Sequence, residues 1–182
     1  MILRFAGVMA LAVAGLFAQA PAASIASHPD WPKAKPEDVK SIDAIVAATY
    51  DVISGPKGQA RDWDRFRSLF VPDGRLIPTS AKPDGHADLT PMTVDQYVAR
   101  VSNSFLANGF FERGISQKVE VYGNIAHVFT TYESRRTPDD PKPFARGINS
   151  FQLLKDGDRY WVVTIYWDAE RAGNPIPAKY LP

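Results

Sequence analysis

Hydrophobic and polar residues change their spacing along the chain, which divides it into a helical first half and a strand-rich second half. From Pro36 to Gly55 the apolar residues recur at steps of three and four and form one stripe: Val39, Ile42, Val46, Tyr50 and Ile53. Proline suits the first turn of a helix and glycine suits its end. This pattern predicts a first amphipathic helix.

Two further helices are predicted before the strands. Asp62 can cap a short helix with three aromatic residues on one face: Trp63, Phe66 and Phe70. Thr93 and Gln96 have the spacing of a capping box. Apolar residues then continue at helical steps until Gly109: Val94, Val98, Val101 and Phe105.

Strand patterns dominate from Phe110 onward, where apolar and polar residues alternate and Gly123-Asn124 and Asp156-Gly157 are tight-turn signals. One earlier strand, Arg75 to Ile77, is predicted between a turn at 72–74 and Pro78, and residues 79–91 are interpreted as a long loop. Three helices, one early strand and a four-stranded run predict an α+β fold, with the helices on one side of an antiparallel sheet.

A two-residue loop at Gly123-Asn124 determines how its two strands pair. The more apolar face then carries four cross-strand pairs: Val121–Ala126, Val119–Val128, Gln117–Thr130 and Ile115–Tyr132. The opposite face places His127 beside Glu120. We therefore interpret His127 as a structural cross-strand partner and not as an acid–base group.

The same reasoning at Asp156-Gly157 places Asn149 opposite Thr164 on one face of the second hairpin. The other face would then expose three large apolar residues: Trp161, Ile165 and Trp167. A patch of this kind usually meets a partner, so we expect a homodimer formed sheet to sheet. The alternative is that the leader or the C-terminal tail covers the patch.

The N-terminal residues have the features of a signal peptide. Arg4 precedes an apolar run from Phe5 to Ala18 that is too short to span a bilayer, and small residues follow. The alternative is an uncleaved anchor or a buried helix. We expect an exported protein, periplasmic or secreted, with four parts: a signal peptide at 1–22, an extended leader at 23–35, one domain at 36–170 and a tail at 171–182.

Charge and composition exclude several classes of function. Without residues 1–22 the count of Lys and Arg falls from 21 to 20, against 20 Asp and Glu. Such a balanced chain has no basic field, so neither nucleic acid nor a membrane is expected as a partner. The absence of cysteine excludes disulfides and thiol chemistry. Asp84, His86 and Asp88 lie close together but lack a second histidine, so neither a metal site nor a cofactor is predicted.

Four stretches follow one another in a characteristic order: a helix with Tyr50, "RDWDRFRSLFVPDGRLI", a third helix, and finally "GNIAHVFTTYES" with "RGINSFQLLKDGDRYWVV". In this order, over about residues 36–170, the chain resembles the NTF2-like superfamily in its SnoaL-like bacterial branch. The resemblance implies a cone, in which a strongly curved antiparallel sheet wraps a long helix and leaves a pocket open at one end.

Some members of this superfamily are enzymes, among them ketosteroid isomerases and polyketide cyclases. Tyr50 falls where the steroid isomerases place the tyrosine that holds an oxyanion. Asn149 falls where they place a protonated aspartic acid that donates a hydrogen bond. Their base, an aspartate just after the first strand, aligns with Pro78-Thr79. The resemblance therefore implies a similar pocket that lacks the isomerase base.

Six uncharged hydrogen-bonding residues are predicted to line the pocket and bind the ligand: Tyr50, Gln117, Thr130, Tyr132, Asn149 and Thr164. Such groups in apolar surroundings suit a small, mainly apolar molecule that carries a carbonyl or hydroxyl. None of them titrates near neutral pH, so no catalytic residue is assigned.

Three functions remain open at this point. The first is a binding module for a small apolar ligand, and the second is an enzyme of the cyclase, dehydratase or isomerase type that acts through hydrogen-bond donors. The third is a structural dimer module whose cavity is filled by side chains. The content of the cone discriminates between them. A filled cone favours the third, amides and hydroxyls alone favour the first, and a buried carboxylate or histidine favours the second.

Overall fold

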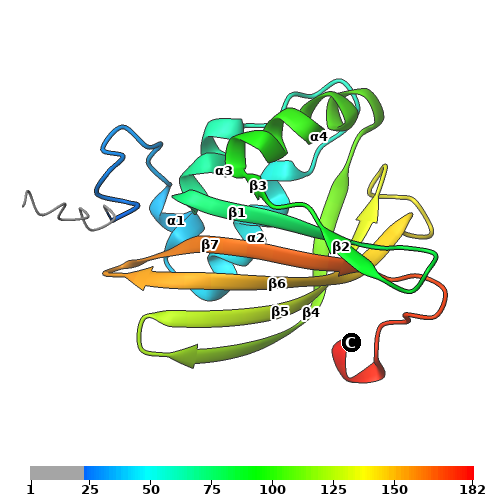
Figure 1. The fold of residues 1–182 in the computed structure, drawn as a ribbon. Helices are drawn as coiled ribbons and strands as arrows, with labels where there is room; N and C mark the ends of the chain where they lie inside the picture. Colours follow the sequence, from blue (N-terminus) through cyan, green and yellow to red (C-terminus); the bar gives the residue numbers. More distant parts are fainter. Residues whose placement is uncertain (1–22) are drawn as a thin grey trace, which may run out of the picture.

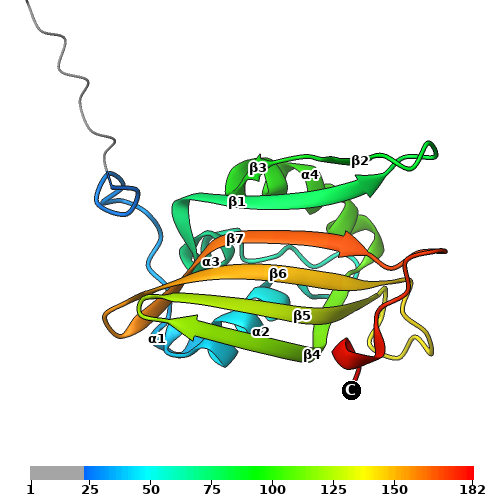
Figure 2. The same ribbon diagram turned by 60° about the horizontal axis from the view of Figure 1, so that its bottom comes forward.

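Residues 23–182 are described by the computed structural model, and they form a curved sheet with helices packed on its concave face (Figures 1 and 2). The helices are α1 (Pro36–Val39), α2 (Ile42–Ile53), α3 (Trp63–Leu69), α4 (Val94–Asn108) and the 3-10 helix η1 (Ala178–Tyr180). The strands are β1 (Phe70–Ala81), β2 (Ala87–Leu89), β3 (Met92–Thr93), β4 (Phe111–Tyr122), β5 (Ile125–Arg135), β6 (Ala145–Asp156) and β7 (Arg159–Ala169). The signal peptide predicted at 1–22 lies outside the described residues and stays a prediction.

The strand order in the sheet is β2-β1-β7-β6-β5-β4, and β3 pairs with β1. The α+β class is confirmed, but the prediction of a wholly antiparallel sheet is wrong, because β1 runs parallel to β7. Antiparallel neighbours such as β4–β5 and β6–β7 are joined by short hairpins, whereas a parallel pair needs a long connection. Here that connection is most of the domain, so the first and last long strands lie side by side.

The second and third predicted helices are confirmed as α3 and α4. The first predicted helix is divided into α1 and α2. Asp62 accepts a hydrogen bond from the backbone N–H of Arg65 at 2.9 Å and caps α3, and the capping box of Thr93 and Gln96 begins α4. The first helix is interrupted at Ser41, whose extended backbone and hydroxyl cap α2 through the Ala44 N–H. The apolar stripe crosses this break, so periodicity alone did not reveal it.

None of the helices in residues 23–182 is long and apolar enough to cross a membrane.

The segment that follows α3 differs most from the prediction. The turn predicted at 72–74 and the loop predicted at 79–91 are wrong. β1 runs from Phe70 to Ala81 and pairs with β2 inside the predicted loop and with β3 directly after it. An irregularity between Phe70 and Arg75 accommodates Pro72 and Gly74. Pro78 remains in the strand because its carbonyl accepts a hydrogen bond from the Thr90 N–H at 3.1 Å.

The first hairpin has the predicted register over most of its length. Gly123 and Asn124 form its loop, and the pairs Val121–Ala126, Val119–Val128 and Gln117–Thr130 are confirmed. Beyond Ser116 a bulge inserts Ile115, so that Gly114 and not Ile115 lies opposite Tyr132. One extra residue exchanges the two faces of the strand beyond it. Glu112, opposite Ser134, is thereby turned to the concave face.

A second bulge changes the β6–β7 hairpin. The loop is Gly157-Asp158, one position later than predicted, and this shift alone leaves the faces unchanged. The bulge at Val163 then exchanges them, so that Asn149 lies opposite Trp167 and Thr164 lies opposite Gln152 on the convex face. The predicted pairing of Asn149 with Thr164 is therefore wrong.

The structure also lacks the exposed apolar patch that was predicted at Trp161, Ile165 and Trp167. Ile165 pairs with Phe151 and is buried in the core, and Trp161 is 7% exposed beneath the guanidinium group of Arg159. The C-terminal tail, the alternative cover for that patch, instead packs on β5. Tyr180 packs its ring 5.0 Å from that of Phe129. The homodimer itself stays a prediction.

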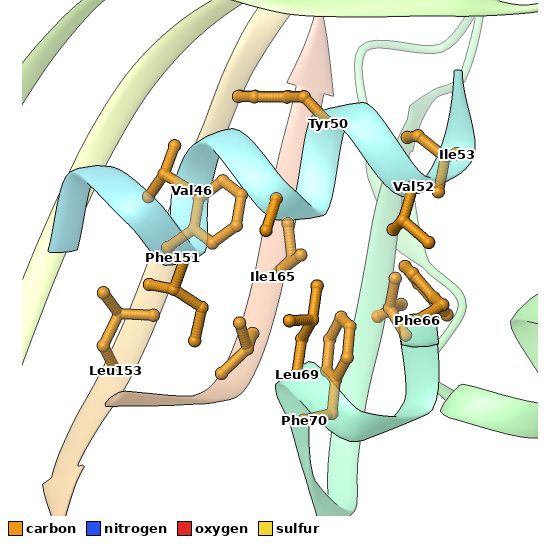
Figure 3. Close-up of a cluster of buried hydrophobic side chains, with 14 of the residues drawn as sticks. Val46, Tyr50, Val52, Ile53, Phe66, Leu69, Phe70, Phe151, Leu153 and Ile165 are labelled. Atoms are coloured by element: carbon orange, nitrogen blue, oxygen red, sulfur yellow. The ribbon is translucent and has the colours of Figure 1, made fainter. Parts of the chain in front are cut away.

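The core lies between α2, α3 and the concave face of the sheet. Figure 3 shows apolar side chains from α2 meeting those of β6 and β7 on one side and those of α3 and the start of β1 on the other. The largest fully buried side chains are Phe66, Phe70 and Phe151. Tyr50 projects from α2 away from Leu69 and Phe70 (Figure 3), and its ring packs edge to face against Phe151 of the core.

Candidate functional site

A hollow of about 250 Å³ remains between α2, α4 and the concave face of the sheet. We call it the cone. Its wall is mostly aromatic and aliphatic, and its large members include Ile53, Phe66, Tyr97, Phe110, Phe151, Ile165 and Trp167. Its polar members come from four elements and include Tyr50 of α2, Glu112 of β4, Tyr132 and Ser134 of β5, and Asn149 of β6. An apolar hollow with a few convergent polar groups is the usual form of a small-molecule site.

The structure brings most of the predicted site residues together. Tyr50, Tyr132 and Asn149 line the cone, and Thr130 is buried opposite Asn149 on the neighbouring strand. Gln117 is exposed and donates a hydrogen bond to Asp43 at 2.7 Å, at some distance along β4. Thr164 lies on the convex face and does not line the cone.

Asn149 and Tyr50 form the first part of a polar cluster. Asn149 is 6% exposed, and its side-chain N–H donates a hydrogen bond to the Tyr50 hydroxyl at 3.1 Å. Burial raises the pKa of Tyr50 well above its usual range, and the nearby charge of Glu112 raises it further. Tyr50 therefore remains a neutral hydrogen-bonding group at any physiological pH.

Glu112 completes the cluster, and the sequence analysis did not identify it. Its carboxylate accepts a hydrogen bond from the buried hydroxyl of Ser134 at 2.7 Å. Burial raises the pKa of Glu112 to about 7, although hydrogen bonds from Ser134 and Asn149 act in the opposite direction. A carboxyl group with this pKa exists in both protonation states near neutral pH, so it can donate and accept a proton.

Two tyrosine hydroxyls in the cone have unused hydrogen-bonding capacity. Within residues 23–182, neither Tyr97 nor Tyr132 has a hydrogen-bond partner for its hydroxyl group, and Tyr132 is only 6% exposed. Burial raises the pKa of each hydroxyl, and the charge of Glu112 adds to this effect. No enclosed side-chain nitrogen or oxygen atom among the described residues lacks a partner, so both hydroxyls open onto the hollow and are free to bind a polar atom of a ligand.

Two glycines allow the cluster to pack. A Cβ atom at Gly114 would lie 3.0 Å from the Thr130 hydroxyl and 3.2 Å from the Tyr50 ring. A Cβ atom at Gly147 would lie 2.6 Å from the Tyr132 hydroxyl. Both glycines therefore serve close approach of aromatic side chains to the backbone, rather than an unusual backbone conformation.

A second hollow, the α2–β4 groove, has a volume of about 670 Å³ and lies beside the cone. Tyr50 and Glu112, which also line the cone, lie at its inner end with the buried Thr130. Val46, Ala47 and Ile115 line it too, and four polar residues lie at its outer end: Asp43, Asp51, Arg113 and Gln117. Glu112 and Tyr50 therefore line two hollows, and only the groove opens between charged side chains.

The remaining candidates have structural roles. His127 lies on the convex face, 2.9 Å from the Ser150 hydroxyl and 3.5 Å from Glu120, as its strand position predicted. In the β1–β2 hairpin, Asp88 pairs with Lys82 and Asp84 accepts a hydrogen bond from the His86 backbone. Among the described residues, no group of three or more His, Asp or Glu side chains could hold a metal ion.

Solved structures share the arrangement of helices on a curved sheet. A protein with a cystatin-like fold from Nostoc punctiforme superposes with a TM-score of 0.54 at 10% identity, covering 72% of this chain and 90% of that one. A second, from Caulobacter vibrioides, reaches 0.51 at 14% identity, covering 72% and 89%. An NTF2-like protein from Silicibacter pomeroyi gives 0.48 at 16% identity, covering 71% and 92%. The chain has the fold of the first two structures, which is described as cystatin-like.

At these identities the solved structures establish the fold and not the activity. No protein-family model matches the chain. Among curated proteins, "Probable endonuclease lcl3" of Emericella nidulans is 27% identical over 169 residues, covering 79% of this chain and 59% of that protein. The protein of the same name from Aspergillus clavatus is 26% identical over 145 residues, covering 65% and 48%. The chain thus spans less than two thirds of the length of these relatives.

Proposed function

We propose that this protein is an enzyme that transfers a proton on a small, mainly apolar carbonyl compound bound in the cone. The observation that carries the proposal is the carboxyl group of Glu112 at the polar end of an otherwise apolar hollow. A binding module would need only hydroxyl and amide groups there, because an ionisable acid is costly to bury. A buried carboxyl group is the feature that separates an enzyme of the isomerase, dehydratase or cyclase type from such a module.

The geometry supports a division of roles. The aromatic wall would hold the hydrocarbon part of the substrate, with its carbonyl oxygen near the free hydroxyls of Tyr97 and Tyr132. Glu112, as a carboxylate, would take a proton from the carbon next to the carbonyl. The C–H bond breaks, an O–H bond forms on Glu112, and the electron pair moves to the carbonyl oxygen, where the two hydroxyls stabilise its negative charge.

The pKa of Glu112 suits this role. A carboxyl group in its usual range is a weak base, and its protonated form is scarce at neutral pH. Raising the pKa to about 7 strengthens the base and keeps both forms populated, so the same group can take a proton and return it. If the proton returns to the same carbon, the substrate exchanges hydrogen with solvent. If the proton is delivered to another carbon, the substrate is isomerised, and if hydroxide is lost, the substrate is dehydrated.

Hydrogen exchange on a simple ketone tests the proposal. The probe is 2-tetralone, a two-ring ketone with acidic C–H groups next to its carbonyl, incubated in D2O at pD 8 and followed by NMR. We expect the protein to accelerate deuterium uptake and Glu112→Gln to lower that rate by about 100-fold or more, with the affinity for 2-tetralone nearly unchanged. Glu120→Gln, on the exposed convex side of the same strand, should behave as the wild type.

The outcomes separate the alternatives. Binding of 2-tetralone without accelerated exchange would contradict the enzyme and leave a binding module. An unchanged exchange rate in Glu112→Gln would assign the proton transfer to another group.

Asn149 offers a prediction on binding that does not depend on catalysis. Asn149→Leu removes the amide group from the polar end of the cone. The Tyr50 hydroxyl then loses the hydrogen bond that orients it. We expect the affinity for 2-naphthol, a flat apolar molecule with one hydroxyl, to fall by about 1–2 kcal/mol, or about 5- to 30-fold. Isothermal titration measures it. A lower melting temperature with unchanged affinity would instead make Asn149 a core residue.

A further inference from the structure

We propose that the α2–β4 groove is a water channel through which Glu112 exchanges its proton with solvent while the cone is occupied by substrate. This inference rests on the proposed function, because it concerns the same carboxyl group. The groove would be a second path to the site, which admits water and not the apolar substrate.

The need for such a path follows from the cone itself. Its wall consists largely of aromatic and aliphatic side chains, and an apolar molecule that fills about 250 Å³ excludes water from that side. Within the cone, Glu112 would then have no partner for its proton except the substrate. A reaction in which the proton must leave for solvent, or be replaced by another, requires water at the carboxyl group.

The groove reaches the same carboxyl group from another direction. Glu112 and Tyr50 line both hollows, and Thr130 joins them at the inner end of the groove. A water molecule needs a cavity of only about 10–15 Å³ and two to four polar partners. The groove, at about 670 Å³, has room for several, and its hydroxyl, amide and carboxylate groups supply the partners.

The partition between the two hollows is thin. It consists of the Tyr50 ring lying against Gly114, where a Cβ atom would approach the ring to 3.2 Å. Asn149 holds Tyr50 in this position from the cone side through the 3.1 Å hydrogen bond to its hydroxyl. Substrate is thereby kept out of the groove by a rigid ring, while the neighbouring Glu112 is accessible from both sides.

The outer part of the groove is suited to water and not to an apolar ligand. Asp43 and Gln117 face each other across it through a 2.7 Å hydrogen bond between α2 and β4. Asp51 is exposed and pairs with Arg65, and the side chain of Arg113 is 71% exposed while its end pairs with Glu133. Charged groups of both signs at an opening hold water and exclude hydrocarbon.

The proton balance of the step is simple. After Glu112 has taken a proton from substrate carbon, its O–H bond breaks and the proton passes to a water molecule in the groove, which becomes hydronium. A proton from solvent returns by the same path, and Glu112 then delivers it to the substrate. No oxidant, reductant or further reactant is needed.

Filling the groove tests the channel. Ala47→Phe places a ring in the groove from α2, and Gln117→Trp narrows it from β4. Ala99→Phe is the matched control, because Ala99 is exposed on α4 and lines none of the hollows that touch Glu112. With 2-tetralone in D2O, we expect both groove variants to lower deuterium uptake by about ten-fold or more, while affinity for 2-tetralone and the Ala99→Phe rate remain those of the wild type.

A second readout detects the water itself. Bound 2-naphthol releases its proton from the excited state only where an acceptor is present, and the emission of the anion differs from that of the neutral molecule. At pH 5 Glu112 is protonated, so water is the acceptor at the polar end of the cone. We expect anion emission in the wild type and in Ala99→Phe, and neutral emission in Ala47→Phe and Gln117→Trp.

The failure of this inference is distinguishable from the failure of the proposed function. If neither probe binds, or if the wild type does not accelerate exchange, the proposed function is wrong and the channel is rejected with it. If exchange is fast and unaffected in both groove variants, the proposed function stands and the channel is overturned. Water would then reach Glu112 through the neighbouring hollow beside Arg113 and Arg135.

Discussion

Replacing Glu112 with glutamine is expected to stabilise the protein at pH 8 by on the order of 2–3 kcal/mol and to leave its stability nearly unchanged at pH 4.5. Burial raises the pKa of this carboxyl group from 4.5 to about 7 in the folded state. The folded protein therefore holds a proton on Glu112 that the unfolded chain loses at lower pH. Its contribution to the free energy of unfolding is complete below about pH 4.5 and declines as the pH rises through 7.

Glutamine keeps the shape and an acceptor for the Ser134 hydroxyl but carries no charge at any pH. Urea unfolding between pH 4.5 and pH 8 measures the difference between the two proteins. Glu120→Gln changes an exposed carboxylate on the same strand and should leave the pH profile of the wild type intact. Parallel profiles for the wild type and Glu112→Gln would show that the carboxyl group titrates in its ordinary range.

Gly147→Ala is expected to lower the free energy of unfolding by about 3 kcal/mol, a large effect for one methyl group. The added Cβ would lie 2.6 Å from the Tyr132 hydroxyl, and the Asp168 backbone oxygen approaches it even more closely. Gly147 belongs to β6, which is paired with β5 on one side and with β7 on the other. Its backbone therefore cannot move without disturbing both neighbouring strands. Thermal or urea unfolding measures the loss.

A double-mutant cycle identifies the cause of this loss. Tyr132→Phe removes the hydroxyl and so relieves one of the close contacts. In the Gly147→Ala protein this change should raise the free energy of unfolding by about 1 kcal/mol. Gly123→Ala serves as the control, since its Cβ would meet nothing within 4 Å and only its positive φ of 55° opposes the change. Equal losses at the two glycines would contradict the steric explanation.

Local signals in the sequence were sufficient where the chemistry is local. The capping box at Thr93 and Gln96 and the cap at Asp62 lie within single turns of helix, and both are confirmed. The loop at Gly123-Asn124 fixed the register as far as Ser116, because pairing follows directly from the loop. The placement of Asn149 and Tyr50 in one cluster required the fold as well, and there the resemblance to NTF2-like proteins was informative.

The failures in β1 have their main physical origin in long-range pairing. β1 remains extended through Pro72 and Pro78 because β7, a partner distant in sequence, pairs along it, while β3 and the hairpin partner β2 pair with its other edge. Local turn chemistry predicted a break at each proline. The interruption at Ser41 has a local cause, a serine cap of α2, which the unbroken apolar stripe conceals.

Glu112 could not be found from alternation alone. Counting every second residue from the Gly123-Asn124 loop turns Arg113 toward the core and Glu112 outward. The bulge at Ile115 reverses this, and the sequence carries no local signal for the bulge. Thr164 was misplaced for the same reason by the bulge at Val163.

The bulge at Ile115 makes the chemistry of the pocket depend on a count of residues as well as on their identity. If Ile115 paired regularly instead of bulging, every residue before it would move by one position, and the cation of Arg113 would face the cone in place of the acid of Glu112. Loss of the single codon for Ile115 would remove the bulge and leave Glu112 opposite Ser134. A strand one residue shorter at this point therefore keeps the same reagent. Related sequences can be compared at this site only after their strand lengths between Glu112 and the Gly123-Asn124 loop have been matched.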